Sequence, residues 1–325
     1  MSHILDVPGL KVGHASDDRA PSGVSVIVMD EPAVASCAIH GGAPGTRETD
    51  ALAPEALGAP VDAICLSGGS AFGLAAADGV QLALAERGRG FAVRGHRVPI
   101  VPGAIIFDLN GPRPDYRALG MAATAAALDG PDDRRLGTVG AGTNAMTAGF
   151  KGGFGSASAR VGAATVGAVA IVNAVGSVTA ANGPWFRAAP FEVGGEFGGL
   201  GTAPEADFAT IRTKHGAAQG SNTVIAAIVT DARLTRAEAK RLAITGHDGF
   251  ALSIFPSHTI LDGDTLFVAS TGRVAGPADP REQVALAATA TTVLARAIAR
   301  AVYEASPADG DRFPTWRSVY GASHG

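Results

Sequence analysis

Short runs of β-branched and small apolar residues alternate with glycine-rich loops along most of the chain. Runs of this kind, when bounded by Gly, Pro, Asn or Asp, are typical of buried strands. The pattern predicts two antiparallel strands within 160–180, and further strands at 24–29, 36–40, 63–67, 223–230 and 265–270. The strands at 24–29 and 36–40 are expected to be two separate strands around Asp30-Glu-Pro.

Helical patterns fall between these strands and after the last one. Thr235, with Glu238 three residues later, forms a capping box that opens one helix. The clearest helix has Asp279 as its N-cap and runs to Tyr303. Two more helices are expected near 74–86 and 117–128. Alternation of strands and helices in this order predicts layers of helix on sheet.

Two stretches are expected to lack regular structure. Residues 98–108 contain prolines and are predicted to be extended. Residues 184–222 are rich in Gly and Pro and are interpreted as a linker between two halves, with one short helical segment at 205–214. No internal repeat of solenoid period is present.

The composition describes a packed globular protein. The chain has 325 residues, which is long enough for one large or two ordinary domains. Of these residues 46% are hydrophobic and only 17% are charged. The net charge is −4 and basic residues form no cluster, so we expect neither nucleic acid nor a membrane surface as a partner.

The two cysteines and the N-terminal residues bear on the compartment and cofactors of the protein. Cys37 and Cys65 fit no metal-binding spacing and are expected to be buried thiols in a reducing compartment. The first residues lack the charged and apolar regions of a signal peptide, and the segment nearest to a membrane span is 161–180. The protein is therefore expected to be cytoplasmic, with no metal ion and no cofactor at its active site.

Two glycine-rich motifs imitate known sites. Residues 68–73 place Ser70 between a strand and a helix, but the second glycine of a nucleophile elbow is displaced. Residues 137–145 imitate a dinucleotide-binding turn, but no acidic residue stands between Lys151 and Phe191, where a ribose ligand is expected. We interpret both motifs as close packing of backbone.

Thr223 is the strongest candidate for catalysis. It is the first residue of a predicted buried strand and follows the loop 216–222, which is rich in Gly, Ser and Asn. If the bond between Asn222 and Thr223 is cut, Thr223 gains an α-amine with a pKa of about 7.7–8.0 beside its hydroxyl. One residue then supplies both nucleophile and general base. The alternative is an ordinary boundary between loop and strand.

Three further features accompany this threonine. Asp262 and Asp264 precede the strand at 265–270, which can return beside the strand of Thr223 and bring a carboxylate to it. The alternative for this pair is a turn or a cation ligand. Asn173 is a polar amide in an apolar run, and is either a structural cross-link or a donor aimed into a site. Lys151 lies among glycines, either near a ligand or in a surface loop.

These motifs together resemble those of the DmpA-type L-aminopeptidase/D-amidase-esterases of peptidase family S58, which include the nylon-oligomer hydrolases. The resemblance runs nearly end to end. It is carried by residues 9–14, 41–49, 66–74, 140–142, 151–158, Asn173, 220–223 and 262–264.

The resemblance implies an α/β (α+β) fold, the αββα sandwich of DmpA/ArgJ-like proteins, which is akin to N-terminal nucleophile hydrolases. It implies one domain over 1–325 that cleaves itself into chains 1–222 and 223–325, and a homo-oligomer, a tetramer of cleaved heterodimers. Carried over residue by residue, the cleavage site is Asn222–Thr223 and Thr223 is the nucleophile. Asn173 is an oxyanion donor.

The set of Thr223, Asp262 and Asp264 is similar to that of the nylon-oligomer branch, in which Lys151 also matches a site lysine. A site tyrosine of that branch corresponds to the region of Phe107 and Asp108, expected here to contact substrate, where no tyrosine stands.

The expected activity is hydrolysis of a peptide or small linear amide through a threonyl ester. There are two alternatives: an acyltransferase of the ornithine acetyltransferase type, or a homologue without catalytic activity. The substrate remains open among N-terminal peptide residues, β-peptides, D-amides and 6-aminohexanoate oligomers.

Overall fold

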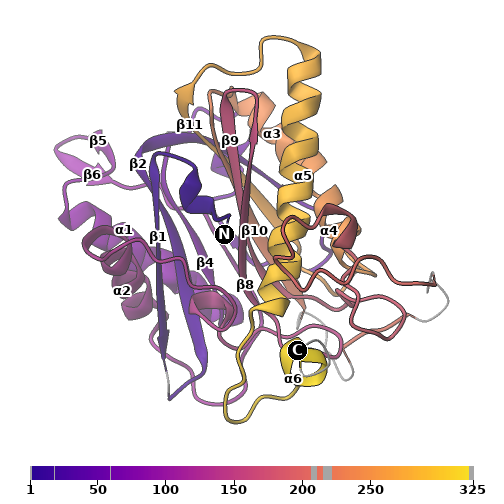
Figure 1. The fold of residues 1–325 in the computed structure, drawn as a ribbon. Coiled ribbons are helices and arrows are strands. Elements are labelled where there is room, and N and C mark those ends of the chain that lie inside the picture. The colour runs from indigo at the N-terminus through magenta and orange to yellow at the C-terminus, as the bar shows by residue number, and fades with distance from the viewer. Residues whose placement is uncertain (1, 18, 59, 206–210, 215–221, 322–325) are drawn as a thin grey trace.

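Two β-sheets that share one long strand form the centre of the computed structural model (Figure 1). The structure describes every residue except 1, 18, 59, 206–210, 215–221 and 322–325. The strands are β1 (Leu10–Asp17), β2 (Ser22–Ile39), β3 (Thr46–Arg47), β4 (Val61–Ser67), β5 (Phe91–Val93), β6 (His96–Val98), β7 (Gly103–Ile105), β8 (Gly153–Val161), β9 (Ala164–Asn173), β10 (Thr223–Ala232) and β11 (Thr265–Val274).

Helices follow the strands in the expected places. The α-helices are α1 (Ala75–Glu86), α2 (Tyr116–Asp129), α3 (Arg236–Gly246), α4 (Asp248–Ser253), α5 (Pro280–Tyr303) and α6 (Trp316–Tyr320). Short 3-10 helices are η1 (Ile4–Asp6), η2 (Asp50–Leu52), η3 (Ser70–Leu74), η4 (Gly140–Gly142) and η5 (Ala189–Phe191). The Thr235 capping box on α3 and the Asp279 cap on α5 are both present, as predicted.

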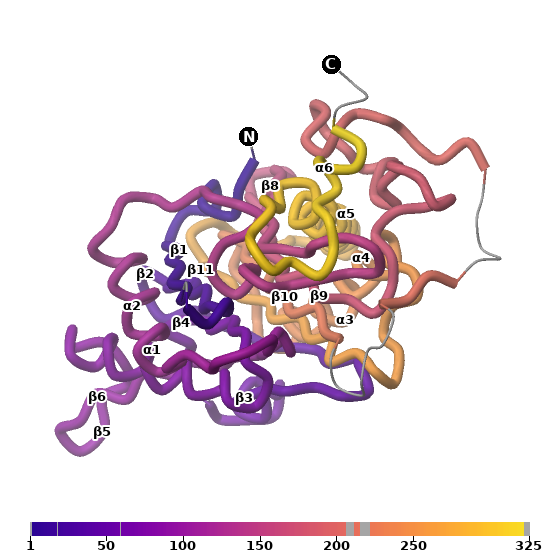
Figure 2. The backbone as a smooth tube through the Cα atoms, turned by 90° about the horizontal axis from the view of Figure 1, so that it is seen from below, coloured from indigo at the N-terminus to yellow at the C-terminus, as the bar shows by residue number. Residues whose placement is uncertain are grey.

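The layers confirm the expected αββα sandwich. Strands are hydrogen-bonded in the order β3-β7-β4-β2-β11-β10-β9-β8, and β1 pairs with β2. Helices α1 and α2 cover one sheet, whereas α3, α4 and α5 cover the other (Figures 1 and 2). Three buried apolar clusters match these interfaces, with one between the two sheets and one beneath each helical layer.

Strand β10 is buried on both faces. Val224 and Ile228 belong to the cluster beneath α3 and α5, whereas Ile225 and Val229 belong to the cluster between the sheets. A strand buried on both faces needs no polar alternation, which explains its continuous apolar sequence. The predicted strand at 223–230 is confirmed.

The expected division into two strands at Asp30-Glu-Pro is wrong, because one strand, β2, runs through it. Residues 30–32 are exposed but lie inside β2, whose pairing shifts register between Val28 and Ala33. The first part of β2 pairs with β1 and β4, and the last part pairs with β11. Because the strand passes from one sheet to the other at this point, it tolerates polar residues that need no burial.

The two strands expected within 160–180 exist, but earlier in the chain, as the hairpin β8–β9 over 153–173. Strand β8 contains Gly153 and Gly155, and glycine is uncommon inside strands. A Cβ added at Gly155 would lie 1.9 Å from the carbonyl oxygen of Ala297, so glycine allows α5 to pack directly on β8. Of the predicted helical segment 205–214, residues 206–210 lie outside the described residues, and 211–214 are not helical.

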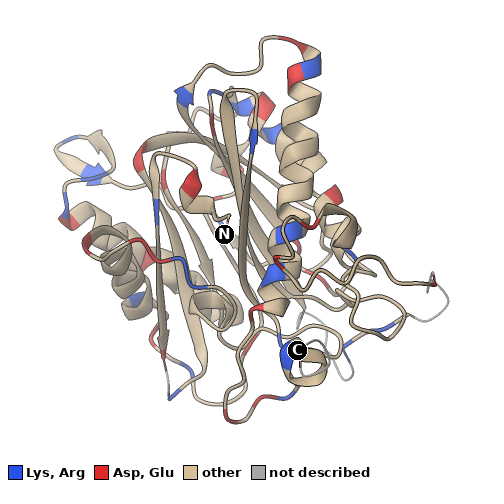
Figure 3. Cartoon of the chain, viewed as in Figure 1, with Lys and Arg blue, Asp and Glu red and all other residues tan. Residues whose placement is uncertain are grey.

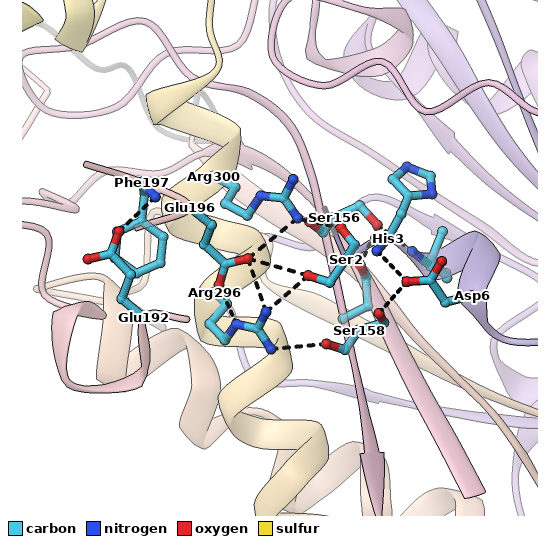
Figure 4. Close-up of polar contacts among 12 residues, drawn as sticks. Ser2, His3, Asp6, Ser156, Ser158, Glu192, Glu196, Phe197, Arg296 and Arg300 are labelled. Carbon is cyan, nitrogen blue, oxygen red and sulfur yellow. Dashed lines mark hydrogen bonds and ion pairs between the residues drawn. The ribbon is translucent and has the colours of Figure 1, made fainter. Parts of the chain in front are cut away.

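A buried ionic cluster fixes α5 to the N-terminal segment (Figure 4). Glu196 pairs with Arg296 and lies 3.7 Å from Arg300. Arg300 also donates to the carbonyl oxygens of Ser2 and Ser156. Elsewhere, the view in Figure 3 shows charges of both signs mainly on helices and loops, while the strands are largely uncharged.

Helix α5, rather than 161–180, comes nearest to a membrane span. Among the described residues it is the one helix long and apolar enough to cross a bilayer, and 67% of its most apolar window is buried inside the protein. The core helix of a folded domain meets the same criteria.

Candidate active site

Strand directions bring four of the predicted site residues to one edge of the sheet. Strand β10 is parallel to β11 and antiparallel to β9. The beginning of β10, the residues before β11 and the end of β9 therefore meet. Thr223 pairs directly with Asn173, and Asn222 forms a parallel bridge with Asp262. The predicted return of the second strand beside the first is confirmed.

The Thr223 hydroxyl lies against the carbonyl group that it would have to attack. In the intact chain this hydroxyl donates a hydrogen bond to the carbonyl oxygen of Asn222. The same oxygen accepts a bond of 3.1 Å from the Gly263 amide. Thr223 is only 3% exposed.

Gly263, between the two aspartates, allows this approach. A Cβ added there would lie 2.8 Å from Oγ1 of Thr223 and 2.7 Å from the carbonyl oxygen of Ala43. These contacts are closer than real Cβ atoms show, so the Asp-Gly-Asp sequence is a steric requirement of the site as well as a turn.

Asp264 holds the backbone beside the candidate nucleophile. Its Oδ1 accepts a bond of 2.9 Å from the amide of Val224, the residue after Thr223. Its Oδ2 accepts from the amide of His258 at 3.0 Å and from its ring Nδ1 at 2.8 Å. In the uncut chain Asp264 therefore orients Thr223 through its neighbour. No motif in the sequence indicates His258.

Asp262 lies beneath the same edge. Its Oδ1 accepts from the Val175 amide at 3.3 Å, and its Oδ2 accepts from the amide and hydroxyl of Thr259 at 3.0 and 2.7 Å. Burial, together with the charge of Asp264, raises the pKa of Asp262 above its ordinary value. The Asp262 carboxylate thus accepts three hydrogen bonds, while burial and the neighbouring Asp264 charge disfavour its ionised form.

Asn173 is completely buried and its amide group has a fixed orientation. Its Oδ1 accepts from the Met146 amide at 3.0 Å and from Nζ of Lys214 at 2.9 Å. Its Nδ2 donates to the carbonyl oxygen of Phe107 at 3.0 Å. With acceptors and donors assigned in this way, the NH₂ group is directed away from Lys214 and toward the Phe107 carbonyl oxygen.

Lys214, like His258, is a site residue that the sequence does not indicate. Its Nζ donates to Oδ1 of Asn173 and, at 3.3 Å, to the carbonyl oxygen of Asn173. Burial lowers the pKa of Lys214 to about 7, although the charge of Asp262 opposes that shift. A single lysine in a Gly/Pro-rich segment, nine residues before Thr223, offers no pattern that would have indicated this contact.

Lys151 is buried, and its ammonium group pairs with Asp311 at 2.7 and 2.9 Å. Its backbone amide donates to the carbonyl oxygen of Pro314. Lys214 contacts Asn173, whereas the ammonium group of Lys151 is directed to Asp311.

The region expected to contact substrate divides into two environments. Phe107 is 37% exposed and lies at the site through its carbonyl contact with Asn173. Asp108 is buried. Its carboxylate accepts hydrogen bonds from the Ser22 hydroxyl at 2.8 Å and from the Gly69 amide at 2.7 Å. Burial raises the pKa of Asp108 to about 6 against these two bonds.

Similarities in sequence and in fold relate the chain to known peptidases. A model of "Peptidase family S58" matches residues 2–313. A Mycobacterium tuberculosis protein described as an uncharacterized aminopeptidase is 41% identical over 355 aligned residues, covering 100% of both chains. A 6-aminohexanoate-oligomer endohydrolase of Kocuria sp. is 32% identical, covering 90% of this chain and 82% of its own.

The solved structure of the L-aminopeptidase D-Ala-esterase/amidase of Ochrobactrum anthropi, described as a variant of the Ntn hydrolase fold, superposes with a TM-score of 0.66. The match covers 96% of this chain and 89% of that one, at 19% identity, and so supports the fold.

Proposed function

The chain belongs to peptidase family S58, and from this membership we propose that it is a self-processing amide hydrolase with Thr223 as its N-terminal nucleophile. The observation that carries the proposal is the position of the Thr223 hydroxyl. It is hydrogen-bonded to the Asn222 carbonyl oxygen, opposite Asn173 and beside the two aspartates.

Self-cleavage would begin at that contact. Oγ1 of Thr223 adds to the carbonyl carbon of Asn222, and the Gly263 amide stabilises the negative charge that develops on the oxygen. The bond from carbon to nitrogen breaks, the hydroxyl proton passes to the leaving nitrogen, and Asn222 is left as an ester on Thr223. Water hydrolyses the ester, which releases the carboxylate of Asn222 and the α-amine of Thr223.

Turnover would reuse the same groups on a bound amide. The α-amine takes the hydroxyl proton while Oγ1 attacks the substrate carbonyl, and Nδ2 of Asn173 donates to the oxyanion. The amine of the substrate leaves with a proton, and water then hydrolyses the acyl-threonine. In this scheme Asp264 holds the Val224 backbone, Asp262 supports the loop, and Lys214 positions the amide of Asn173. Lys151 anchors the C-terminal segment through Asp311.

We propose small peptides with a free N-terminal residue as the first substrate class, because the 41% identical relative is described as an aminopeptidase. The 32% identical relative named as a 6-aminohexanoate-oligomer endohydrolase makes ω-amino acid oligomers the second class. A panel of amino-acid p-nitroanilides, dipeptides and 6-aminohexanoate oligomers separates the two.

The test of the chemistry is to trap the acyl-enzyme. Rapid quenching with an ester substrate, followed by peptide mass mapping, should find the acyl group on Thr223 and on no other residue. An acyl group elsewhere would contradict the proposal. Adding a free amine as acceptor shows whether acyl transfer, rather than hydrolysis, is the main reaction.

We also propose that cleaved chains assemble into a homo-oligomer. Large apolar side chains are exposed on two separate elements, Val284 at the start of α5 and Phe91 with Val98 on the β5–β6 hairpin. Exposed apolar groups of this kind favour association. Sedimentation equilibrium would measure whether the particle is a tetramer of heterodimers.

A further inference from the structure

Three histidines from separate segments gather beside the candidate active site. His40 follows the end of β2, His247 joins α3 to α4, and His258 lies in the loop before the two aspartates. One ring nitrogen from each histidine lies within 4.8 Å of the other two. The rings of His40 and His247 are stacked with centroids 3.8 Å apart, and the His258 ring is tilted by 69° to that of His247.

Hydrogen bonds fix which nitrogen carries the proton in two of these rings. Nε2 of His247 lies 3.0 Å from the carbonyl oxygen of Ala38, which can only accept, so Nε2 carries the hydrogen. Nδ1 of His258 lies 2.8 Å from Oδ2 of Asp264, and by the same reasoning Nδ1 carries the hydrogen there. In the neutral rings, Nδ1 of His247 and Nε2 of His258 are therefore lone pairs.

These two lone-pair nitrogens are buried and, within the part of the chain that the structure describes, neither has a hydrogen-bond partner. Buried polar atoms are normally satisfied, and an exception calls for a ligand or a role. Histidine ligands of metal ions typically donate their other ring N–H to a carboxylate or a backbone carbonyl. His258 with Asp264 and His247 with Ala38 show both versions of that arrangement.

We propose that His40, His247 and His258 bind a divalent transition-metal ion that prefers imidazole nitrogen, with Zn²⁺ as the representative ion. Three neutral imidazoles and one open position are a known tetrahedral zinc set. Tetrahedral coordination with Zn–N distances of about 2.0–2.1 Å requires ligand nitrogens about 3.4 Å apart. The cluster must therefore contract, and a turn of the exposed His40 ring toward His247 and His258 would achieve this.

Charge around the cluster is mixed. Asp264 and Asp248 favour a cation near His40, and Lys240 opposes one. Burial opposes protonation of His258, but the hydrogen bond to Asp264 and the charge of that carboxylate raise the pKa of His258, so a proton competes with a metal ion for that ring.

A bound ion would join the end of β2, the α3–α4 junction and the loop that carries Asp262 and Asp264. It would fix the ring of His258, and through it the carboxylate that holds the backbone beside Thr223. The site thus goes beyond the amide chemistry, because it supports the nucleophile strand without contacting a reacting atom.

The test is calorimetric titration of chelator-treated protein with Zn²⁺ alone at about pH 8, where imidazole is neutral. Wild-type protein should bind one equivalent per chain, and Co²⁺ should give the visible absorption of a tetrahedral complex. Melting temperature should rise with added Zn²⁺, because the ion binds the folded state. His247→Ala should abolish saturable binding. His96→Ala, which removes an exposed histidine in β6, is the matched control and should bind as wild type does.

His247→Ala removes a buried ring and can reduce folding, so His40→Ala at an exposed position provides the second variant. The His40→Ala variant should fold normally. It should not bind one equivalent of Zn²⁺ tightly, and with Co²⁺ it should not show the absorption of a tetrahedral complex. The proposal is wrong if wild-type protein shows no saturable equivalent, or if His40→Ala and His247→Ala both retain it.

Discussion

Asn173 and Thr223 lie directly opposite each other as paired residues of the antiparallel strands β9 and β10. The pairing places the side-chain amide at the end of β9 beside the first residue of β10, next to the apolar runs 166–172 and 224–229. A rigid sheet therefore sets the distance between the proposed nucleophile and the proposed oxyanion donor, instead of a loop.

The first prediction concerns this donor. Asn173→Ala should lower kcat for amide hydrolysis by about 10²–10³ while changing KM little, because the lost bond matters most in the transition state. Steady-state kinetics on fully cleaved protein would measure the effect. Asn110→Ala, which removes an exposed asparagine, should leave both constants unchanged.

Gly263 supplies the second prediction. Gly263→Ala should prevent or strongly slow self-cleavage, because its Cβ would lie 2.8 Å from Oγ1 of Thr223. We expect a stability loss of about 1–3 kcal/mol as well, which is usual for an overpacked buried position. Gly321→Ala adds a Cβ with ordinary contacts and should cleave normally. Cleavage of Gly263→Ala at the wild-type rate would show that this close approach is unimportant.

Lys214 supplies a prediction on pH. Its pKa is about 7 in the folded chain and near 10.5 when unfolded, so the unfolded state binds more protons between these values. Stability should therefore rise from about pH 7 toward pH 10, by at most about 1.4 kcal/mol per pH unit from this group. Below about pH 7 the lysine is charged in both states and its slope disappears.

Lys214→Met should remove that slope. Chemical denaturation at several pH values would measure it, in a Thr223→Ala background that keeps the chain intact so that unfolding involves one chain. Lys11→Met, at a partly buried position remote from the site in sequence, should keep the slope. An unchanged slope in Lys214→Met would mean that Lys214 does not titrate in this range.

The buried pair of Glu196 and Arg296 gives a prediction on stability. Glu196→Gln should cost about 3–5 kcal/mol, because it leaves the buried charge of Arg296 without its carboxylate partner. Asp30→Asn breaks the exposed pair with Arg273 and should cost at most about 1 kcal/mol. Urea denaturation of both variants in the uncleaved background compares them directly, and equal losses would contradict this account.

The parts of the site that sequence could predict are those determined by strand ends. Thr223 and Asp264 border continuous apolar runs, and a strand–helix–strand connection of their spacing returns in parallel, so their proximity followed from pattern. Lys214 and His258 lie in irregular segments whose course depends on tertiary packing, and no local periodicity indicates them. The glycines of β8 were misleading for a related reason. These glycines allow β8 to pack closely against α5, which is distant from it in sequence.

The central claim is that Thr223 becomes an N-terminus. Intact-mass measurement of purified wild-type protein and of Thr223→Ala tests it most directly, with Thr230→Ala, another buried threonine of β10, as control. We predict two chains, 1–222 and 223–325, for wild type and for Thr230→Ala, and one uncut, inactive chain for Thr223→Ala. An uncut wild-type chain of 325 residues with full amidase activity would contradict the claim.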